Sequence, residues 1–220
     1  MTPGADTTAK AGRSTGGRRP TGQVRSGLIE AGIELARAGG PDAVVLREAT
    51  RKVGVAPNAA YKHFADRDEL LAEVCLFAMG QLAGAMRVGV AEVPMRYGTK
   101  TGAKARLGAI GHAYLDFAVA ERGLFETAFA IPDHLRYAND DAGGEGTRSP
   151  LGILRDSLDE LTRAGVLAAE RRPNIEYSVW ATVHGLATLI NQGPLRTMTT
   201  DALHDLGTQL FGFIVRAIST

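Results

Sequence analysis

One stretch in the first third of the chain, Gly54 to Phe64 (GVAPNAAYKHF), most constrains what the chain can fold into. A helical pattern from Arg47 to Val53 precedes it. Gly54 follows where a helix commonly ends, because glycine enters the left-handed backbone region at little cost. Pro57 stands where the first turn of a second helix needs no amide partner. The sequence therefore predicts two short helices joined by a tight turn, with Ala60 and Phe64 facing inward.

The outward residues of the predicted second helix are typical of a helix that lies in the major groove of DNA. Ala59 is small enough to let a backbone approach closely, and Asn58 can pair with a base edge. Lys62 and His63 can contact phosphate. A helical hairpin with a solvated polar face would explain this stretch equally well, so the wider sequence has to decide.

Charge is distributed unevenly along the chain. Residues 1–65 contain ten Lys or Arg and five Asp or Glu, although the whole chain of 220 residues carries a net charge of only +1. The remainder is therefore acidic. A basic head on an acidic body is expected when only one end of a protein meets a polyanion.

The segment around this stretch resembles the TetR family of bacterial regulators. The matching residues are RSGLIEAGIELARAGG (25–40), LREATRKVG (46–54), AAYKHF (59–64) and DELL (68–71). Farther on, the segment from Trp180 to Gly185 (WATVHG) resembles the Trp-His-Gly signature of one C-terminal domain type in that family. The resemblance covers most of residues 22–220. It implies an all-α fold in which a long helix joins an N-terminal three-helix helix-turn-helix head to a helical ligand-binding and dimerisation body.

The resemblance also implies roles for single residues of the head. It makes Tyr61 and Lys62 phosphate contacts, places Pro57, Asn58 and Ala59 closest to base edges, and lets His63 contact either. The position of Arg47 at the start of the preceding helix suits it for phosphate better than Arg51. Tyr61 has an alternative role in core packing, with only its hydroxyl at the surface. Family members often carry a hydroxyl residue near Val45 and near Ala56, which caps a helix and contacts phosphate, and both hydroxyls are absent here.

Three regions are expected along the chain: a disordered basic tail (1–22), a helix-turn-helix DNA-binding domain (23–66), and a ligand-binding and dimerisation domain (67–220). Asp66 with Glu69 has capping-box spacing at the start of the long helix. Residues 92–102 and 132–150 are expected to be loops. The periodicity of apolar residues predicts helices over 24–38, 66–90, 105–120, 124–131, 151–164, 174–191 and 203–218.

The last two predicted helices are apolar on more than one side. In the first, Tyr177, Trp180, Ala181, His184 and Thr188 form one stripe, and Val179, Val183, Leu186 and Ile190 form another. A helix that is apolar on two sides must be covered on two sides. A second copy of the chain can supply the cover in an intermolecular four-helix bundle, giving a homodimer, or internal neighbours can bury both stripes.

Several body residues combine polar groups with apolar surroundings, as the walls of small-molecule pockets do. Each alone is more often a packed core residue, but together they are the candidate ligand pocket: Met86, His112, Tyr114, Phe125, Trp180 and His184. No histidine, cysteine or carboxylate spacing indicates a metal site, and no nucleophile or phosphate-loop motif indicates catalysis. The sequence therefore predicts neither an enzyme nor a bound cofactor.

The sequence also bears on location and redox state. No apolar run approaches the ~20 residues that span a bilayer, and there is no apolar core of a signal peptide, so we expect a cytoplasmic protein that does not contact membranes. Cys75, the only cysteine, lies among apolar residues and is expected to be a buried structural thiol.

The function expected from these features is that of a DNA-binding transcriptional regulator, and in particular a homodimeric repressor that a small-molecule ligand releases from a palindromic double-stranded operator. Two alternatives stay open. The chain can be a helical small-molecule-binding protein or enzyme with an incidental basic head, or it can be a regulator that is independent of ligand or acts as an activator. Salt-dependent binding to a preferred duplex separates the first alternative from the main interpretation.

Overall fold

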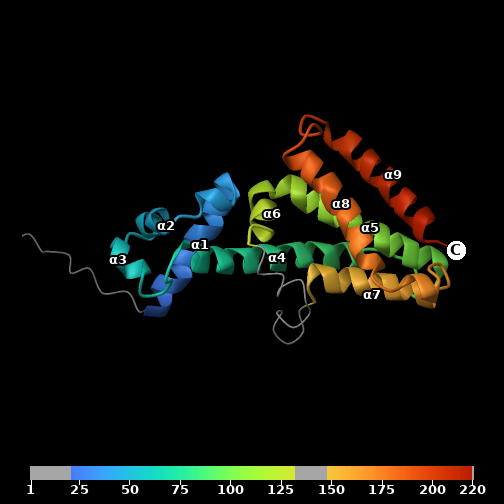
Figure 1. Ribbon diagram of the computed structural model, residues 1–220, viewed down its shortest axis with the longest axis horizontal. Helices are drawn as coiled ribbons and strands as arrows, with labels where there is room; N and C mark the ends of the chain where they lie inside the picture. The colour runs from blue at the N-terminus through green and yellow to red at the C-terminus, as the bar shows by residue number, and fades with distance from the viewer. Residues whose placement is uncertain (1–20, 132–147, 220) are drawn as a thin grey trace, which may run out of the picture.

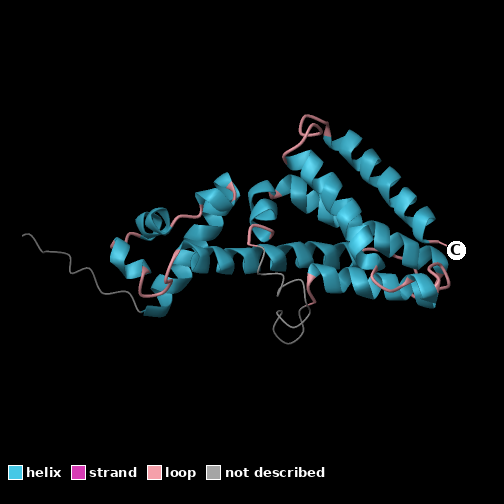
Figure 2. Ribbon diagram, viewed as in Figure 1, coloured by secondary structure: helices cyan, strands magenta, loops and turns pink. Residues whose placement is uncertain are grey.

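The computed structural model describes residues 21–131 and 148–219. In this part of the chain the elements are helices joined by turns, without a strand (Figure 2), apart from an isolated bridge between Leu167 and Ser219. The all-α prediction is confirmed. The expectations for the N-terminal tail and for the 132–150 loop fall almost wholly outside the described residues. Where they overlap, helix α1 already begins at Thr21, within the predicted tail.

The head contains α1 (Thr21–Gly39), the 3-10 turn η1 (Pro41–Ala43), α2 (Leu46–Val53) and α3 (Pro57–Ala60). Both α2 and α3 pack on α1. The small core between them is fully buried and consists of Leu28, Val44, Ala49, Ala60 and Phe64. Ala60 and Phe64 therefore face inward, as their spacing predicts.

The long helix α4 (Arg67–Ala91) runs from the head through the body (Figure 1). Its N-terminus is capped as predicted, because the Asp66 carboxylate accepts the Glu69 N–H at 2.9 Å and the Glu69 carboxylate accepts the Ala65 N–H at 2.5 Å. By length and composition α4 could cross a membrane, contrary to the expectation that no run is long enough. In the folded protein one side of it packs on α1, α5, α6 and α7, and the rest is half-buried or exposed.

The body consists of α5 (Lys100–Ala120), α6 (Arg122–Ala128), α7 (Pro150–Arg163), the 3-10 turn η4 (Ala169–Arg171), α8 (Ile175–Asn191) and α9 (Thr200–Ile218). Helix α5 is central, packing on α4, α6, α7, α8 and α9. It begins five residues before the predicted start, since the Thr99 hydroxyl accepts the Gly102 N–H at 3.1 Å and caps it. The predicted 92–102 loop is correspondingly shorter.

Helices α8 and α9 each bury one face and leave the other uncovered. The stripe of Val179, Val183, Leu186 and Ile190 on α8 is buried against the body. The other side of α8 exposes Tyr177 and Leu189, which are 49% and 45% exposed. On α9, Phe211, Ile214 and Ile218 are buried, whereas Phe213 is 58% exposed. Internal neighbours thus cover one apolar side of each helix, and on the second stripe of α8 they half-bury only Trp180 and His184.

The single cysteine lies where α4 meets α6. Cys75 is buried and its thiol donates to the Thr127 carbonyl oxygen at 2.9 Å. Burial raises the pKa of this thiol to about 11. The expectation of a buried structural cysteine is confirmed.

Candidate nucleic-acid interface and ligand cavity

The turn between α2 and α3 has the geometry that the sequence predicts. Gly54 has a φ of 73°, in the left-handed region, and its N–H donates to the Thr50 carbonyl at 2.9 Å. The Val55 N–H reaches the same carbonyl at 3.1 Å. Val45 and Ala56 occupy the N-cap positions of α2 and α3 without a side-chain cap. The first amides of α2 are therefore free of a competing side-chain acceptor.

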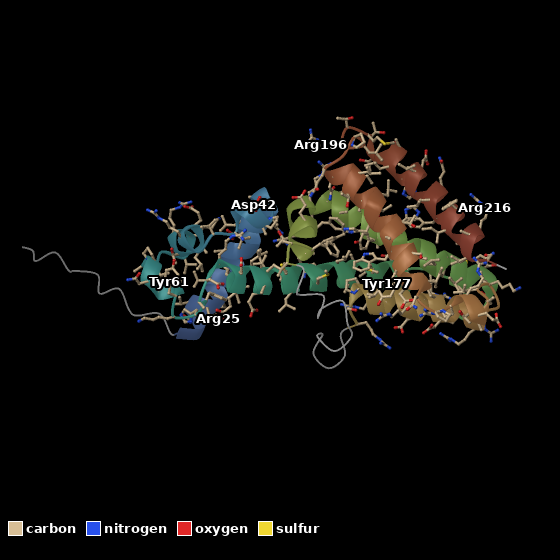
Figure 3. All side chains as sticks on the ribbon, in the orientation of Figure 1. Arg25, Asp42, Tyr61, Tyr177, Arg196 and Arg216 are labelled. Atoms are coloured by element: carbon tan, nitrogen blue, oxygen red, sulfur yellow. The ribbon has the colours of Figure 1, made fainter. Side chains whose placement is uncertain are left out.

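Helix α3 is only four residues long, and the chain continues as a turn in which the His63 and Phe64 N–H groups donate to the Ala60 carbonyl. Pro57, Asn58 and Lys62 are exposed, and Ala59 and His63 are half-buried. Tyr61 is 62% exposed and lies at the outer end of the head (Figure 3), which argues against its alternative role in core packing. The structure thus brings the predicted DNA-contacting residues of α3 together on one outer surface.

The cations of the head differ in whether acids already neutralise them. Arg51 pairs with Glu48 at 2.9 Å, and Lys52 pairs with Glu34 at 2.7 Å. Within residues 21–131 and 148–219, neither Arg47 nor Lys62 has an ion-pair partner. These two cations are exposed and no carboxylate neutralises them, so both are available to contact phosphate.

An apolar cavity of about 250 Å³ lies in the body between α4, α5, α7 and α8. We call it the apolar cavity. Carbon and sulfur dominate its wall, and none of its lining residues in the described part of the chain carries a charge. The lining residues are Met79, Met86, Leu107, Ile110, Gly111, Tyr114, Ala128, Phe129, Ile131, Pro150, Leu151, Leu154, Val179, Trp180, Val183, Phe211 and Ile214.

The polar groups of this wall already bond to one another. The Trp180 Nε1–H donates to the Tyr114 oxygen at 3.2 Å, and the same hydroxyl lies 2.8 Å from His184 Nδ1. The indole can only donate, so the Tyr114 oxygen accepts from it, and the direction of the Tyr114–His184 bond is set by the tautomer of His184. Burial lowers the pKa of His184 and raises that of Tyr114. All three side chains are therefore neutral at pH 7, and the cavity favours an uncharged, apolar occupant.

The predicted pocket residues divide into three groups. Met86, Tyr114 and Trp180 line the apolar cavity. Phe125 and His184 lie outside the lining but are tied to it, since Phe125 packs edge-on against Tyr114 and His184 bonds to its hydroxyl. His112 also lies outside the lining: it stacks on His204 of α9 with ring centroids 4.7 Å apart, and it packs edge-on against Phe211, which lines the cavity.

Sequence reasoning missed several residues of the wall, among them Met79, Phe129 and Phe211. Met79 and Phe211 follow the apolar periodicity of their helices, which marks them as core without showing that the core is hollow there. Phe129 follows the short helix α6 four residues after the predicted Phe125, so helical spacing could have pointed to it. Its contact with Trp180 of α8 comes from tertiary packing and gave no signal in the sequence.

Helix α6 links this cavity to the head. Its Ala128 and the following Phe129 line the cavity, while its N-terminal turn packs on α1 and η1. A Cβ on Gly123 would lie 2.0 Å from the Ala36 carbonyl oxygen, so only glycine allows this approach. Arg37 of α1 pairs with Glu121 at 3.1 Å beside it. Helix α6 thus contacts the cavity at one end and α1 of the head at the other.

Comparisons with known proteins agree with this architecture. Residues 28–74 match the family profile described as "Bacterial regulatory proteins, tetR family", and residues 107–215 match "Tetracyclin repressor-like, C-terminal domain". The second match contains the segment from Trp180 to Gly185. None of the curated proteins matches the sequence.

Solved structures share the fold over nearly the whole chain. A protein of unknown function from Rhodococcus sp. RHA1 is 25% identical with a TM-score of 0.64, over 94% of this chain and 100% of that one. The regulator FadR from Bacillus subtilis, in complex with stearoyl-CoA, is 18% identical with a TM-score of 0.63, over 88% and 98%. The TetR family regulator PfmR from Thermus thermophilus is 18% identical with a TM-score of 0.57, over 86% and 97%.

The two profile matches are the N- and C-terminal halves of one family, and they fall on the helix-turn-helix head and on the helical body respectively. With the exposed basic surface of the head and the shared fold, they establish that the chain belongs to the TetR family and is a DNA-binding transcriptional regulator.

Proposed function

We propose that the protein is a homodimeric repressor that leaves a palindromic operator when a small apolar molecule enters the apolar cavity. Residues 23–66 serve as the DNA-binding domain, and residues 67–220 serve as the ligand-binding and dimerisation domain. The observation that carries the proposal is an uncompensated basic surface at one end of a chain whose other end contains an apolar cavity.

The contacts proposed for DNA are those of the exposed α3 surface and its flank. Arg47, Tyr61 and Lys62 contact phosphate, and Pro57, Asn58 and Ala59 face base edges, with His63 able to reach either. The unpaired state of Arg47 and Lys62 supports this assignment, because a cation already held by a carboxylate gains less from phosphate.

The surface proposed for dimerisation is the uncovered side of α8 and α9. Tyr177, Leu189 and Phe213 are large apolar side chains exposed there, with the small Ala181 and Gly185 between the first two. Small residues let a partner helix approach closely while the large ones pack around it. Pairing these helices across a two-fold axis would set two heads about 34–36 Å apart, the spacing of successive major grooves.

The ligand proposed for the apolar cavity is small, uncharged and apolar. The volume of the apolar cavity, about 250 Å³, lies near the lower end of the ~300–1,000 Å³ that is typical of small-molecule pockets. The structurally similar FadR binds stearoyl-CoA, so this fold accommodates a ligand with a large apolar part. A charged group in the apolar cavity would lose its hydration without gaining a counter-ion.

Two elements would carry the effect of a ligand to the head. Helix α4 belongs to both parts, and we propose its segment Val74 to Val90 as the lever between them. Helix α6 offers a second route, since it contacts the cavity at one end and α1 at the other. The ligand lowers DNA affinity only by the difference between its affinities for the two arrangements of the heads.

The experiment that tests the proposal starts from the intergenic DNA beside the protein's own gene. A duplex containing an inverted repeat from that region should shift in a gel at concentrations where random duplex does not. Apolar compounds that raise the melting temperature of the protein should then release the duplex. A compound that stabilises the protein but leaves DNA affinity unchanged would contradict the ligand response while leaving DNA binding intact.

A further inference from the structure

A second cavity lies at the end of α4 that is remote from the head. Its volume is about 450 Å³, and α4, α5 and α7 together with Tyr97 enclose it. We call it the arginine cavity, because four of its lining residues are arginines. Its lining consists of Arg87, Val90, Ala91, Tyr97, Arg106, Ile110, Arg148, Ile153, Asp156, Ser157, Glu160 and Arg163. Ile110 also lines the apolar cavity.

The floor of the arginine cavity is a buried ion pair whose charged groups are already hydrogen-bonded within the protein. Arg106, 1% exposed, forms a two-pronged contact with Glu160 in which Nε donates to Oε2 at 2.8 Å. Its Nη1 donates to the Met95 carbonyl at 2.8 Å, and the Tyr97 ring covers the guanidinium at 3.8 Å. The Gly98 N–H donates to the same Glu160 carboxylate. This pair holds the segment before α5 in place and contributes no net charge to the cavity.

Among the described residues, the remaining charges of the lining do not balance. Arg148 pairs with Asp156 at 3.3 Å. Arg87 on α4 and Arg163 on α7 are left, and within the described ranges neither has an ion pair or a side-chain hydrogen bond. Both residues are exposed, and two like charges that line one cavity repel each other. An anion between them would turn this repulsion into two charge-assisted contacts.

A buried hydroxyl in the same wall also lacks a partner. Ser157 lies on α7 and is 6% exposed, and its Oγ bonds to no group in the described part of the chain. A buried hydroxyl normally finds an acceptor, often the carbonyl one helical turn earlier. If the buried Ser157 hydroxyl turned toward the cavity, an anionic oxygen there would be such an acceptor, so two arginines and one unpartnered hydroxyl are available to one space.

We propose that the arginine cavity binds a doubly charged anionic group of the phosphate type, held by Arg87 and Arg163 and accepting a hydrogen bond from the Ser157 hydroxyl. Because Ile110 lines both cavities, the group can arrive in two ways. It is either a free ion or the head of a molecule whose apolar part enters the apolar cavity. This site is independent of the DNA-binding surface, which lies at the other end of the molecule.

Calorimetric titration of the full chain with inorganic phosphate, at constant ionic strength and without DNA, tests the proposal. The double variant Arg87→Gln/Arg163→Gln should bind phosphate at least about tenfold more weakly than the wild type, since both charge-assisted contacts are lost. The matched control Arg122→Gln/Arg196→Gln removes the same two charges from exposed positions outside the cavity, with Arg196 in the turn between α8 and α9 (Figure 3), and should bind as the wild type does. Equal affinity of all three proteins would overturn the proposal.

Ser157→Ala provides a readout that a merely structural role would not give. Without phosphate, its melting temperature should equal or exceed that of the wild type, because the hydroxyl has no partner to lose. With phosphate, its stabilisation should be smaller. A loss of stability without phosphate, combined with an unchanged response to phosphate, would contradict the role of Ser157 and count against the site.

Octyl phosphate and octanol distinguish the two sources of the anionic group. If the group is the head of an amphipathic ligand, octyl phosphate binds more tightly than both inorganic phosphate and octanol, and the double arginine variant loses that advantage over octanol. If it is a free ion, octyl phosphate and inorganic phosphate bind alike. Octanol binding as tightly as octyl phosphate, with inorganic phosphate not binding, would overturn the anion site and leave the proposed apolar ligand standing.

Discussion

Arg47 and Lys62 differ from the other cations of the head in one physical respect. Arg51 and Lys52 point outward as well, yet each already holds a carboxylate within 2.9 Å. A cation that must leave an acid to reach phosphate gains only the difference between two similar contacts. Exposure alone therefore does not identify the residues that matter for DNA.

Lys62→Ala tests this distinction. Affinity should fall to a similar extent for all duplexes, and the slope of log affinity against log salt should decrease by about one unit, as one phosphate contact is lost. Fluorescence anisotropy at several salt concentrations measures both. Arg51→Ala is the matched control, and its slope should change less because Glu48 already neutralises that charge. Equal slopes for Lys62→Ala and the wild type would rule out the phosphate contact.

Glu160 governs a second prediction, which concerns pH. Its hydrogen bonds with Arg106 hold the pKa of this carboxyl below its ordinary value of 4.5. A depressed pKa in the folded state stabilises the protein at pH values above the ordinary pKa, and the contribution disappears as the pH falls through the folded value.

Glu160→Gln should therefore lower the free energy of unfolding at pH 7 by about 3–5 kcal/mol, because Arg106 is left buried without its counter-charge. The difference between variant and wild type should shrink as the pH falls below about 4.5. Urea unfolding at several pH values measures it. A difference that stays constant down to pH 3 would show that the loss is one of packing rather than charge.

The candidate site was only partly predictable at this scale. Gly54, Pro57, Ala60 and Phe64 obey local rules of turns and helical faces, and the structure places all four as those rules require. The lining of the apolar cavity cannot be predicted by such local rules, because its residues come from several separate helices. His112 and His184 both lie on helices with apolar stripes, but His112 stacks on His204 of α9, whereas His184 bonds to the Tyr114 hydroxyl. Which helix covers a residue is decided by tertiary packing.

Among the elements, the short helix α6 connects the head with the cavity. Seven residues suffice to contact the head at one end and the cavity at the other. Gly123 makes the first contact possible, since its backbone approaches the Ala36 carbonyl more closely than any side chain would allow. The close packing of α6 on α1 therefore depends on the lack of a Cβ atom at Gly123.

Gly123→Ala should push α6 away from α1. The forced contact should cost about 1–3 kcal/mol of stability, as overpacking does, and DNA affinity should change without any alteration of the DNA-contacting surface. Gly108→Ala is a matched control in α5 with no atom within 4 Å of the new Cβ, and it should stabilise by about 0.5–1 kcal/mol. Thermal melting and anisotropy on the same samples provide both readouts. Unchanged DNA affinity in Gly123→Ala would remove α6 from the route to the head.

The ends of the helices were predictable where a capping residue or a glycine marks them in the sequence. The Asp66 and Glu69 pair located the start of α4, and Gly54 located the end of α2. The start of α5 was missed because Pro94 and Gly98 suggested a loop that extends to Gly102, while Thr99 caps the helix. The shared periodicity of α8 and α9 showed that both are apolar on two sides, but not which side faces inward.

At the scale of the whole molecule, the uncovered side of α8 and α9 sets the expected assembly. Phe213, 58% exposed, lies on this side. In a two-fold symmetric interface every residue occurs twice, so one substitution is felt in both subunits. Two heads held at a fixed separation bind two half-sites far more tightly than one head binds one.

Phe213→Glu should therefore convert a dimer into a monomer and weaken binding to the palindromic duplex by more than about tenfold, on the order of the loss of one of two linked sites. Sedimentation velocity measures the first effect and anisotropy the second. Val88→Glu is the matched control, because Val88 is equally exposed at 57% but lies on α4. A Phe213→Glu protein that remains dimeric would place the interface elsewhere.

The solitary thiol of Cys75 gives this protein an intrinsic chemical probe of its own opening. A maleimide or disulfide reagent can reach the sulfur only when α4 and α6 part, since the thiol is buried and donates to the Thr127 carbonyl between them. With a pKa of about 11 it is also a slow nucleophile while folded. The labelling rate under native conditions would thus report how often these two helices separate, and an occupant of the apolar cavity that holds them together should slow the labelling without any engineered reporter group.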